Sequence, residues 1–378
     1  MRGGRGGITN MQTPYFQIDI KRLERNLERL SWLEKESGVK ILHTLKSFNH
    51  PKIIPLIASK LSGFSVSSLI EVNMAIEANA QNIHLYAPAF KEDNLKELIS
   101  KVSTLSLNSL SQWERFGNGD FSPEQRRQSL PIPSNTSIGV RINPKLHLPI
   151  PSYCNPNLSY SRLGVDYQKF LETFNLDEFK NLEGLHFHAL FQSSVEGASI
   201  LLDHIMAHYQ NILPQLRWVN FGGGHNFTDK DYDTKRFIEL SKNFKLNYPH
   251  IQLYFEPGES VLRDTGEFVA TVLDIIDSIV ILDTSIETHL LDVAIVNQRL
   301  KVKGTQISST PYYYELTGNS CLQGDIIGEY FFQKPLTIGD RVVFEDMMSY
   351  TMVKMTRFNG MEFAPLIIYN FSSPVEPL

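Results

Sequence analysis

Short runs of β-branched and aromatic residues alternate with longer stretches of helical period from residue 39 onward. This alternation is typical of βα units that build a parallel sheet in an α/β protein. Eight such runs span about 220 residues, the size at which a parallel sheet closes into a (β/α)8 TIM barrel. The predicted strands are Val39–Leu45, Gly63–Ser67, Ile83–Ala87, Thr104–Asn108, Ser137–Ile142, Gly184–Leu190, Arg217–Phe221 and Ile251–Glu256.

A doubly wound open sheet is the alternative α/β fold. It would carry fewer strands, and its first strand would lead into a glycine-rich turn. Here the turn after the first predicted strand reads TLKSFNH, without glycine. The pattern therefore favours the closed barrel.

After Glu256 the pattern changes, because strand-like runs follow one another without helical spacers. Such a pattern predicts an all-β domain. The run PYFQIDI, before the barrel, predicts one more strand of the same sheet and is followed by a helix from Lys21. The C-terminal strand-like runs are FVATVLDIID, SIVILD, PYYYELTG, IGEYFF, DRVVFED and YTMVKMTRFNG.

The expected organisation therefore has three parts, with a discontinuous β domain. Residues 1–20 are an N-terminal tail and a strand that joins the β domain. Residues 21–260 form the barrel, and residues 261–378 form the C-terminal β domain. The chain of 378 residues is long enough for one large and one smaller domain.

Composition narrows the class of protein. A net charge of −5 and a pI near 6.1 give no basic surface for nucleic acid. The two cysteines, Cys154 and Cys321, cannot form a disulfide framework, which fits a reducing cytoplasm. No apolar run approaches the roughly 20 residues of a membrane span. The first ten residues, MRGGRGGITN, lack the apolar core of a secretory signal and are expected to be a flexible tail.

Barrel enzymes carry their chemistry at the carboxyl ends of the strands. Four groups of reactive or flexible residues fall there: Lys46 after the first strand, His188 near the end of the sixth, Gly222–Gly224 after the seventh, and Glu256 at the end of the eighth. These positions are the candidate site.

The glycines and the lysine each have a structural and a functional interpretation. Three glycines alone indicate a tight turn, but after the seventh strand they favour a phosphate loop, because backbone N–H groups can approach an anion closely. Lys46 could form an ion pair. In a partly desolvated pocket it could instead form a Schiff base with an aldehyde cofactor.

Glu256 and the HxH pair also leave two interpretations open. Glu256 is either an ordinary strand-end carboxylate or the partner of a pyridinium nitrogen, which would make a ring cofactor an electron sink. His186 and His188 lie on one face of their strand, so a metal site is an alternative to ring stacking by His188. A metal would need further ligands from other strand ends, where only scattered histidines such as His84 and His225 occur. We therefore predict no metal.

In the β domain, GNSCLQGD places Cys321 and Asp325 in one glycine-containing loop. Cys321 is either a small buried residue or a proton donor near a cofactor. Negative charge for an amine-bearing substrate could come from Asp325, or from the carboxylates of Asp292, Asp346 and Glu71.

Taken together, these residues resemble the fold type III pyridoxal-phosphate decarboxylases, the alanine racemase-like barrel enzymes that include ornithine and diaminopimelate decarboxylases. Within that group the chain is most similar to the carboxynorspermidine and carboxyspermidine decarboxylases. The resemblance runs from Thr13-Pro14 to about Gly360. It is carried by TLKSF, SSLIE, YAPAFKED, YSRLG, GLHFHAL, WVNFGGGHNFT, EPGES, LTGNSCLQGD and FEDMMSYTMVKMTRFNG.

The resemblance implies a pyridoxal 5′-phosphate cofactor, a homodimer with shared active sites, and a polyamine product, norspermidine or spermidine. It implies that Lys46 and Cys321 are catalytic, Lys46 as the Schiff-base lysine and Cys321 as a proton donor from the second subunit. The implied cofactor-binding residues are Lys46, His188, Gly222, Gly223, Gly224, Glu256 and Tyr350. The candidate substrate-binding residues are Asp325, Gln192, Asp292 and Glu259.

The sequence also departs from the family pattern at positions expected to face the substrate. Phe191-Gln192 replaces a Cys-Glu pair, and Ala294–Gln298 replaces a Met-Pro-Tyr stretch; Asn157–Ser159 also differs. Another basic or diamino acid, such as diaminopimelate or ornithine, is therefore the alternative substrate. An amino-acid racemase and a non-catalytic homologue fit less well, because Cys321 and the complete set of cofactor residues argue against them.

Overall fold

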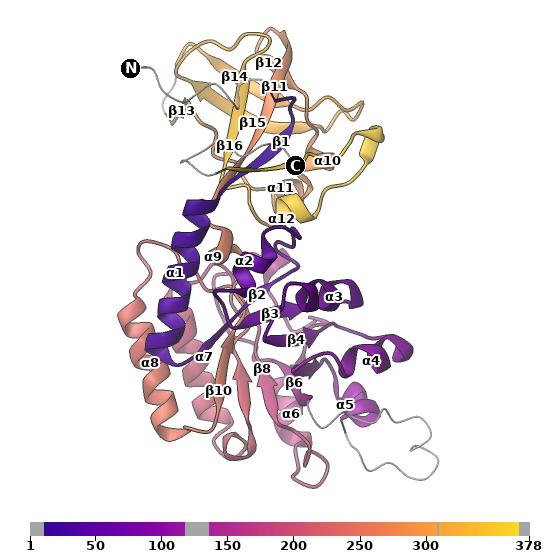
Figure 1. Ribbon diagram of the computed structural model, residues 1–378, viewed down its shortest axis with the longest axis vertical. Helices are drawn as coiled ribbons and strands as arrows, with labels where there is room; N and C mark the ends of the chain where they lie inside the picture. Colours follow the sequence, from indigo (N-terminus) through magenta and orange to yellow (C-terminus); the bar gives the residue numbers. More distant parts are fainter. Residues whose placement is uncertain (1–10, 118–135, 308–309, 370–378) are drawn as a thin grey trace. The chain divides into compact units, whose positions relative to one another are not determined.

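The computed structural model describes residues 11–117, 136–307 and 310–369, so the glycine- and arginine-rich first ten residues lie outside the described part. The chain divides into two compact units (Figure 1). One consists of Met1–Asn26 and Leu262–Leu378, and the other is Leu27–Val261. None of the described helices combines the length and apolarity needed to cross a bilayer.

In the described part of Leu27–Val261, eight parallel strands form a closed ring. The ring order is β2, β3, β4, β5, β6, β8, β9 and β10, and β10 pairs with β2. The predicted TIM barrel is therefore confirmed, and each predicted run contributes one strand. The strands are β2 (Lys40–Thr44), β3 (Gly63–Val66), β4 (Asn82–Tyr86), β5 (Thr104–Leu107), β6 (Ser137–Asn143), β8 (Gly184–His186), β9 (Trp218–Asn220) and β10 (Gln252–Phe255).

Helices alternate with these strands and surround them (Figure 1). Two of them begin with an N-cap serine, whose hydroxyl oxygen accepts from the backbone N–H three residues later. Ser68 accepts from Glu71, and Ser109 accepts from Gln112. The segments are α1 (Ile20–Ser37), which leads into the unit, α2 (Ile54–Ala58), α3 (Leu69–Glu77), α4 (Glu92–Ile99), α5 (Leu110–Phe116), η1 (Ser152–Cys154), β7 (Val165–Asp166), α6 (Tyr167–Thr173), α7 (Val195–His208), η2 (Leu213–Gln215), α8 (Thr234–Asn247) and α9 (Glu259–Leu262).

The barrel core depends on a match between a large and two small side chains. The ring of Trp218 occupies the space beside Gly139 and Gly184, where an added Cβ would lie 2.5 Å and 1.9 Å from ring atoms. Its indole Nε1 donates to Ser137 Oγ at 2.8 Å. Buried indole N–H groups need such a partner. The two glycines in strands β6 and β8 are thus required by packing.

The other unit is built on a largely antiparallel sheet of order β13-β15-β14-β12-β11-β1-β17, with β16 beside β11. Strand β1, the run expected to join this sheet, pairs antiparallel with β11 and parallel with β17. The strands are β1 (Tyr15–Asp19), β11 (Gly266–Ile276), β12 (Ile279–Leu282), β13 (Thr305–Gln306), β14 (Tyr313–Thr317), β15 (Ile326–Phe332), β16 (Arg341–Glu345) and β17 (Leu366–Tyr369).

Two details of the expected β domain are wrong. The run YTMVKMTRFNG forms the helical turn α12 (Tyr350–Val353) and the 3-10 turn η3 (Phe358–Gly360). Its strand-like alternation is overridden by local and tertiary hydrogen bonds, because Lys354 N donates to Tyr350 O at 2.9 Å and Thr356 N to Thr288 O at 2.9 Å.

The expected absence of helical spacers is the second error. Helices α10 (Ile286–His289) and α11 (Leu291–Val296) follow β12. Ser285 caps α10 by accepting from Glu287 N. A capping serine is a sequence signal for a helix start, but α10 is short and follows strand-like runs, so the signal was missed. The unit is therefore mostly sheet rather than all-β.

Candidate active site

The predicted cofactor residues of the barrel follow four adjacent strands and lie at one end of the barrel. Lys46 follows β2, Glu256 follows β10, Gly222–Gly224 follow β9, and His188 follows β8. These strands are consecutive in the ring, although Lys46 and Glu256 lie far apart in the sequence. Because parallel strands share one direction, all four groups meet at their carboxyl ends.

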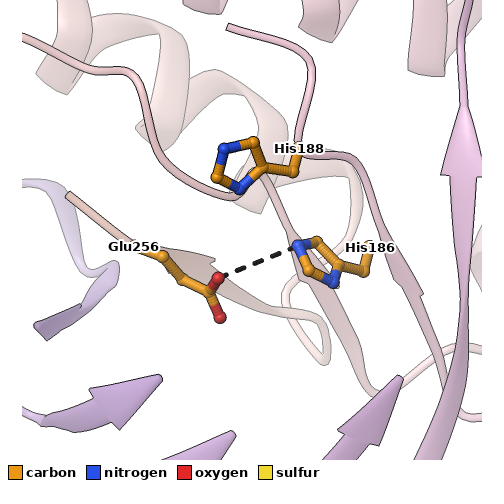
Figure 2. Close-up of side chains that lie close together, drawn as sticks. All are labelled: His186, His188 and Glu256. Atoms are coloured by element: carbon orange, nitrogen blue, oxygen red, sulfur yellow. Dashed lines mark ion pairs between the residues drawn. The ribbon is translucent and has the colours of Figure 1, made fainter. Parts of the chain in front are cut away.

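Glu256 is a buried carboxylate, 3% exposed, at the centre of this site. Asn220 Nδ2 donates to its Oε1 at 2.7 Å. His84 Nε2 lies 3.8 Å from Oε1 and His186 Nε2 lies 3.8 Å from Oε2 (Figure 2 shows His186). Burial lowers the pKa of both imidazoles, so neither ring carries a positive charge at neutral pH. The carboxylate is thus held by a neutral donor beside neutral rings, an environment suited to a cationic ring nitrogen.

The three glycines form a backbone turn that admits no side chain. Gly222 and Gly224 have φ values of +68° and +86°. A Cβ would lie 2.7 Å from His188 Cα at Gly222, 2.8 Å from Glu256 O at Gly223, and 2.2 Å from Leu190 O at Gly224. Successive N–H groups in such a turn make an anion-binding concavity. The lack of side chains would let the phosphate of the expected cofactor approach this backbone, in which Gly222 N donates to Asn220 Oδ1 and Gly223 N to His188 Nδ1.

His188 stands beside this loop as a neutral ring. Its Nδ1 accepts from Gly223 N at 3.2 Å, which leaves the proton on Nε2. Burial, followed by the charge of Lys46, lowers the pKa of His188 well below its ordinary value. Arg141, itself buried, donates to His188 O at 3.3 Å and lies over the Tyr86 ring at 4.5 Å. A flat neutral imidazole fixed at its Nδ1 fits the predicted stacking role.

Lys46 occupies the turn after β2 with an exposed side chain. After burial, the charge of Lys46 contributes to the lowered pKa values of His188 and His186, and it opposes the raised pKa of Glu71. Burial is nevertheless the largest effect on Glu71 and raises its pKa. The side chain is exposed, whereas the Schiff-base interpretation of the sequence expected a partly desolvated pocket, so the role of Lys46 stays a prediction.

The metal alternative also has a geometric basis. Ligand atoms of His186, His188 and Glu256 lie within 4.8 Å of one another (Figure 2). A metal-binding histidine normally donates its second ring N–H to a partner. Among the described residues, neither ring nitrogen of His186 has a hydrogen-bond partner. The ring therefore lacks the support that is usual for a metal ligand.

Two candidate substrate residues meet at the barrel mouth. Gln192 adopts a left-handed conformation, with φ of +42°. Its Nε2 donates to Glu259 Oε2 at 3.1 Å. The exposed amide and the half-buried carboxylate form one polar pair, which joins the loop after β8 to the start of α9.

In the β unit, Cys321 is exposed and Asp325 is buried beneath the same loop. Asp325 Oδ1 accepts from Ile286 N at 2.7 Å and Oδ2 accepts from Ser320 N at 3.0 Å. Asp325 therefore ties the loop of Cys321 to the start of α10. Its oxygens point to backbone donors, which gives this predicted substrate residue a clear structural task.

Two further β-unit candidates, Asp292 and Tyr350, lie together around one lysine, whereas Asp346 accepts from Asp264 N at 2.6 Å. Asp292 forms an ion pair with Lys354. The Lys354 ammonium also lies 4.9 Å from the ring centre of Tyr350. Tyr350 and Asp292 are therefore close together. This arrangement does not depend on the cofactor and substrate roles that the resemblance implies for them.

The sequence interpretation missed Asn220 and Arg141. Both are buried and bonded to the predicted site residues. Asn220 ends β9 two residues before Gly222, so its position at a strand end was the available signal. Arg141 lies within a predicted strand, and a charged residue in such a run was the signal there.

Comparisons with known proteins place this site in a family, although no family model matches the chain. Lysine decarboxylase from Selenomonas ruminantium shares the fold, with a TM-score of 0.77 at 20% identity, covering 98% of this chain and 97% of that one. The crystal structure of carboxynorspermidine decarboxylase from Campylobacter jejuni, complexed with norspermidine, has a TM-score of 0.83 at 36% identity over 95% of each chain. The architecture is thus that of the barrel decarboxylases.

Two curated relatives narrow the class. The carboxynorspermidine/carboxyspermidine decarboxylase of Campylobacter jejuni subsp. jejuni is 37% identical over 97% of this chain and 95% of the relative. The carboxyaminopropylagmatine decarboxylase of a Synechocystis strain is 35% identical over 93% of this chain and 89% of the relative. The chain belongs to the carboxynorspermidine/carboxyspermidine decarboxylase family, and the resemblance seen in its motifs is confirmed.

Proposed function

We propose that this protein is a pyridoxal 5′-phosphate-dependent decarboxylase of a carboxylated polyamine. Its substrate is carboxynorspermidine or carboxyspermidine, and its products are CO2 and norspermidine or spermidine. The observation that carries this proposal is the convergence of Lys46, His188, Gly222–Gly224 and Glu256 at one end of the barrel, in a chain similar over its length to such decarboxylases.

Each barrel residue has a physical task toward the cofactor. Lys46 would hold it through the side-chain amine, and its phosphate would lie against the backbone of the glycine loop. His188 would cover one face of the ring, and Glu256 would keep a proton on the ring nitrogen. When bound, the cofactor supplies an electron sink for the pair released as the substrate carboxylate leaves as CO2.

The neutral state of His188 matters for this arrangement. A charged imidazole against a cationic ring would be repelled, whereas a neutral ring can stack on it. Because burial and Lys46 hold the His188 pKa low, the ring stays neutral across the physiological range. Burial also lowers the pKa values of His84 and His186, so neither imidazole would carry a proton in place of the cofactor ring nitrogen beside Glu256.

The polar pair of Gln192 and Glu259 suits a cationic substrate arm. The amide donates to one carboxylate oxygen and leaves the negative charge of Glu259 to attract an ammonium group. Asp292 is a further candidate for this role in the β unit. A carboxylated polyamine carries such cationic groups beyond its reacting end.

The active form that we propose is a cytoplasmic homodimer. In it, Cys321 would serve the barrel of the other subunit and donate the proton that replaces the lost carboxylate. The exposure of Cys321 leaves the thiol accessible for that task. Tyr350 would contact the phosphate, and Asp325 would hold the Cys321 loop from below.

Absorbance of the purified protein tests the cofactor. The wild type should show the visible band of a lysine-bound pyridoxal phosphate, and borohydride should abolish it. A colourless protein whose activity follows added divalent metal, and is lost on chelation, would instead support the metal site of His186, His188 and Glu256.

Substrate identity is tested by CO2 release from a panel of amino acids. Carboxynorspermidine or carboxyspermidine should give the highest kcat/KM. The controls are carboxyaminopropylagmatine, diaminopimelate and ornithine. Preference for any control, with the cofactor present, would keep the decarboxylase and reject the proposed substrate.

A further inference from the structure

Asn220 is the last residue of β9, and its side chain is completely buried. The two polar atoms of its side-chain amide bond to different partners, one as a donor and the other as an acceptor. Nδ2 donates to Glu256 Oε1 at 2.7 Å, and Oδ1 accepts from Gly222 N at 2.8 Å. One side chain therefore joins the carboxylate expected at the cofactor ring to the loop expected at its phosphate.

We propose that Asn220 is a positioning residue, which fixes Glu256 relative to the glycine loop and so matches the site to both ends of the cofactor. This inference rests on the proposed function, because it gives Asn220 a task only where a ring and a phosphate bind together. Asn220 acts through Glu256 and Gly222.

The chemistry of the amide explains why asparagine suits this position. The task needs a donor toward Glu256 and an acceptor toward Gly222, and one amide supplies both. Aspartate would keep the acceptor and place a second negative charge against Glu256. Serine has too short a side chain to bridge the two partners. A neutral donor also holds the carboxylate without cancelling its charge, which a lysine or arginine would do.

The surrounding groups do not replace this bond. His84 and His186 each lie 3.8 Å from a carboxylate oxygen, beyond hydrogen-bond distance. Within the described residues, Asn220 is the side chain that donates a hydrogen bond to this carboxylate.

A closed set of hydrogen bonds connects Asn220 to the other residues of the site. Glu256 N donates to Gly222 O at 2.8 Å, so Asn220, Glu256 and Gly222 are joined pairwise. The next loop N–H, at Gly223, donates to His188 Nδ1. Shifts of about 1 Å in a catalytic constellation can cost on the order of a hundredfold in rate. Loss of Asn220 would therefore displace the ring partner, the loop and the stacking histidine relative to one another.

Asn143 provides a matched control in the same barrel. It is the last residue of β6, it is buried, and its Oδ1 accepts from the N–H two residues later, that of Lys145, at 3.0 Å. Its Nδ2 donates to Leu158 O at 3.1 Å. The two asparagines thus share type, burial and turn, and differ in that Asn220 contacts the cofactor candidate Glu256, whereas Asn143 contacts Leu158 O.

The experiment compares Asn220→Asp, Asn220→Ser, Asn143→Asp and Asn143→Ser, each freed of cofactor. Calorimetry measures two dissociation constants, for inorganic phosphate and for pyridoxine 5′-phosphate, which cannot react with Lys46 because it has no aldehyde. Circular dichroism checks that each variant is folded. If Asn220→Asp does not fold, Asn220→Ser provides the comparison with the Asn143 variants.

Asn220→Asp keeps the loop acceptor and loses the donor to Glu256. It should weaken pyridoxine 5′-phosphate binding by about 10- to 100-fold and leave phosphate binding within about twofold of wild type. Asn220→Ser should weaken pyridoxine 5′-phosphate binding by about tenfold. Both Asn143 variants should bind both ligands as the wild type does.

A merely structural role would weaken both ligands alike at Asn220 and at Asn143. Folded Asn220 variants that bind pyridoxine 5′-phosphate as tightly as the Asn143 variants would also overturn the inference. If the wild type itself fails to bind pyridoxine 5′-phosphate, the proposed function has failed as well.

Discussion

The barrel and the β unit present their predicted residues in different ways. In the barrel, Lys46, His188, Gly222–Gly224 and Glu256 follow neighbouring strands, and hydrogen bonds link the glycine loop to His188 and Glu256. In the β unit, Cys321 lies on an exposed loop, and Asp325 is buried under it. Parallel topology brings the barrel residues together within one unit, whereas Cys321 and Asp325 are held by the loop that they share. We therefore expect barrel changes to affect cofactor binding, and β-unit changes to affect turnover.

The largest effect is expected for Lys46→Ala. Without the amine that holds the cofactor, the visible absorbance should disappear and decarboxylation should fall by on the order of 10³-fold or more. The exposed lysine variant Lys96→Ala, on α4, is the control and should keep both. A Lys46→Ala protein that retains the absorbance band would contradict the expectation that changes in the barrel affect cofactor binding.

Cys321→Ser should separate turnover from cofactor binding. The weaker acid should lower kcat by about 100-fold, within the range of general acid catalysis, while the absorbance band stays unchanged. Stopped-flow kinetics and the absorbance spectrum measure the two quantities. Loss of the band, or an unchanged kcat, would contradict the division of labour between the units.

The sequence predicted the barrel well because its signals are local. Each strand is a short apolar run, and residues that follow strands must lie at one end of a parallel barrel, so Lys46 and Glu256 could be placed without any tertiary information. Strand lengths were less certain. The run Gly184–Leu190 becomes a strand only to His186, although Phe187 N still donates to Asn220 O at the end of the β8–β9 pairing.

The β unit was harder to predict because tertiary contacts decide its local structure. Thr356 bonds to Thr288, and Lys354 pairs with Asp292, both far away in the sequence. Asn220 shows the same limit in the barrel. Its position at the end of a strand was visible, but its partner Glu256 was known only once β9 and β10 were seen side by side.

Asp325→Asn should destabilise the β unit rather than change cofactor binding. The new amide NH2 would face a backbone N–H donor, at Ile286 or Ser320, and lose that hydrogen bond. The free energy of unfolding should fall by about 1–3 kcal/mol in urea denaturation. Asp340→Asn, which alters an exposed turn at Thr337, is the control and should cost about 1 kcal/mol or less. Equal losses in the two variants would refute the anchoring role of Asp325.

The barrel should lose stability in acid, because its buried histidines are neutral. Burial lowers the pKa of His43 to about 4 from an ordinary value near 6.5. The unfolded chain then binds more protons than the folded one, so stability falls as pH drops through this window. For His43 alone the loss is on the order of 2 kcal/mol at about pH 5.

His43→Gln should therefore reduce the slope of stability against pH between about 6.5 and 4, as measured by thermal unfolding. Glutamine can still donate toward Phe48 O, the partner of His43 Nε2 at 2.9 Å. An unchanged slope would show that this imidazole does not titrate as the barrel environment implies.

Covalent labelling of Lys46 tests the central claim most directly. The protein purified with its cofactor is reduced with borohydride, digested and analysed by mass spectrometry. The account predicts a pyridoxyl phosphate group on the peptide that contains Lys46 and on no other lysine peptide. An unlabelled protein, or a label on a different lysine such as Lys354, would contradict it.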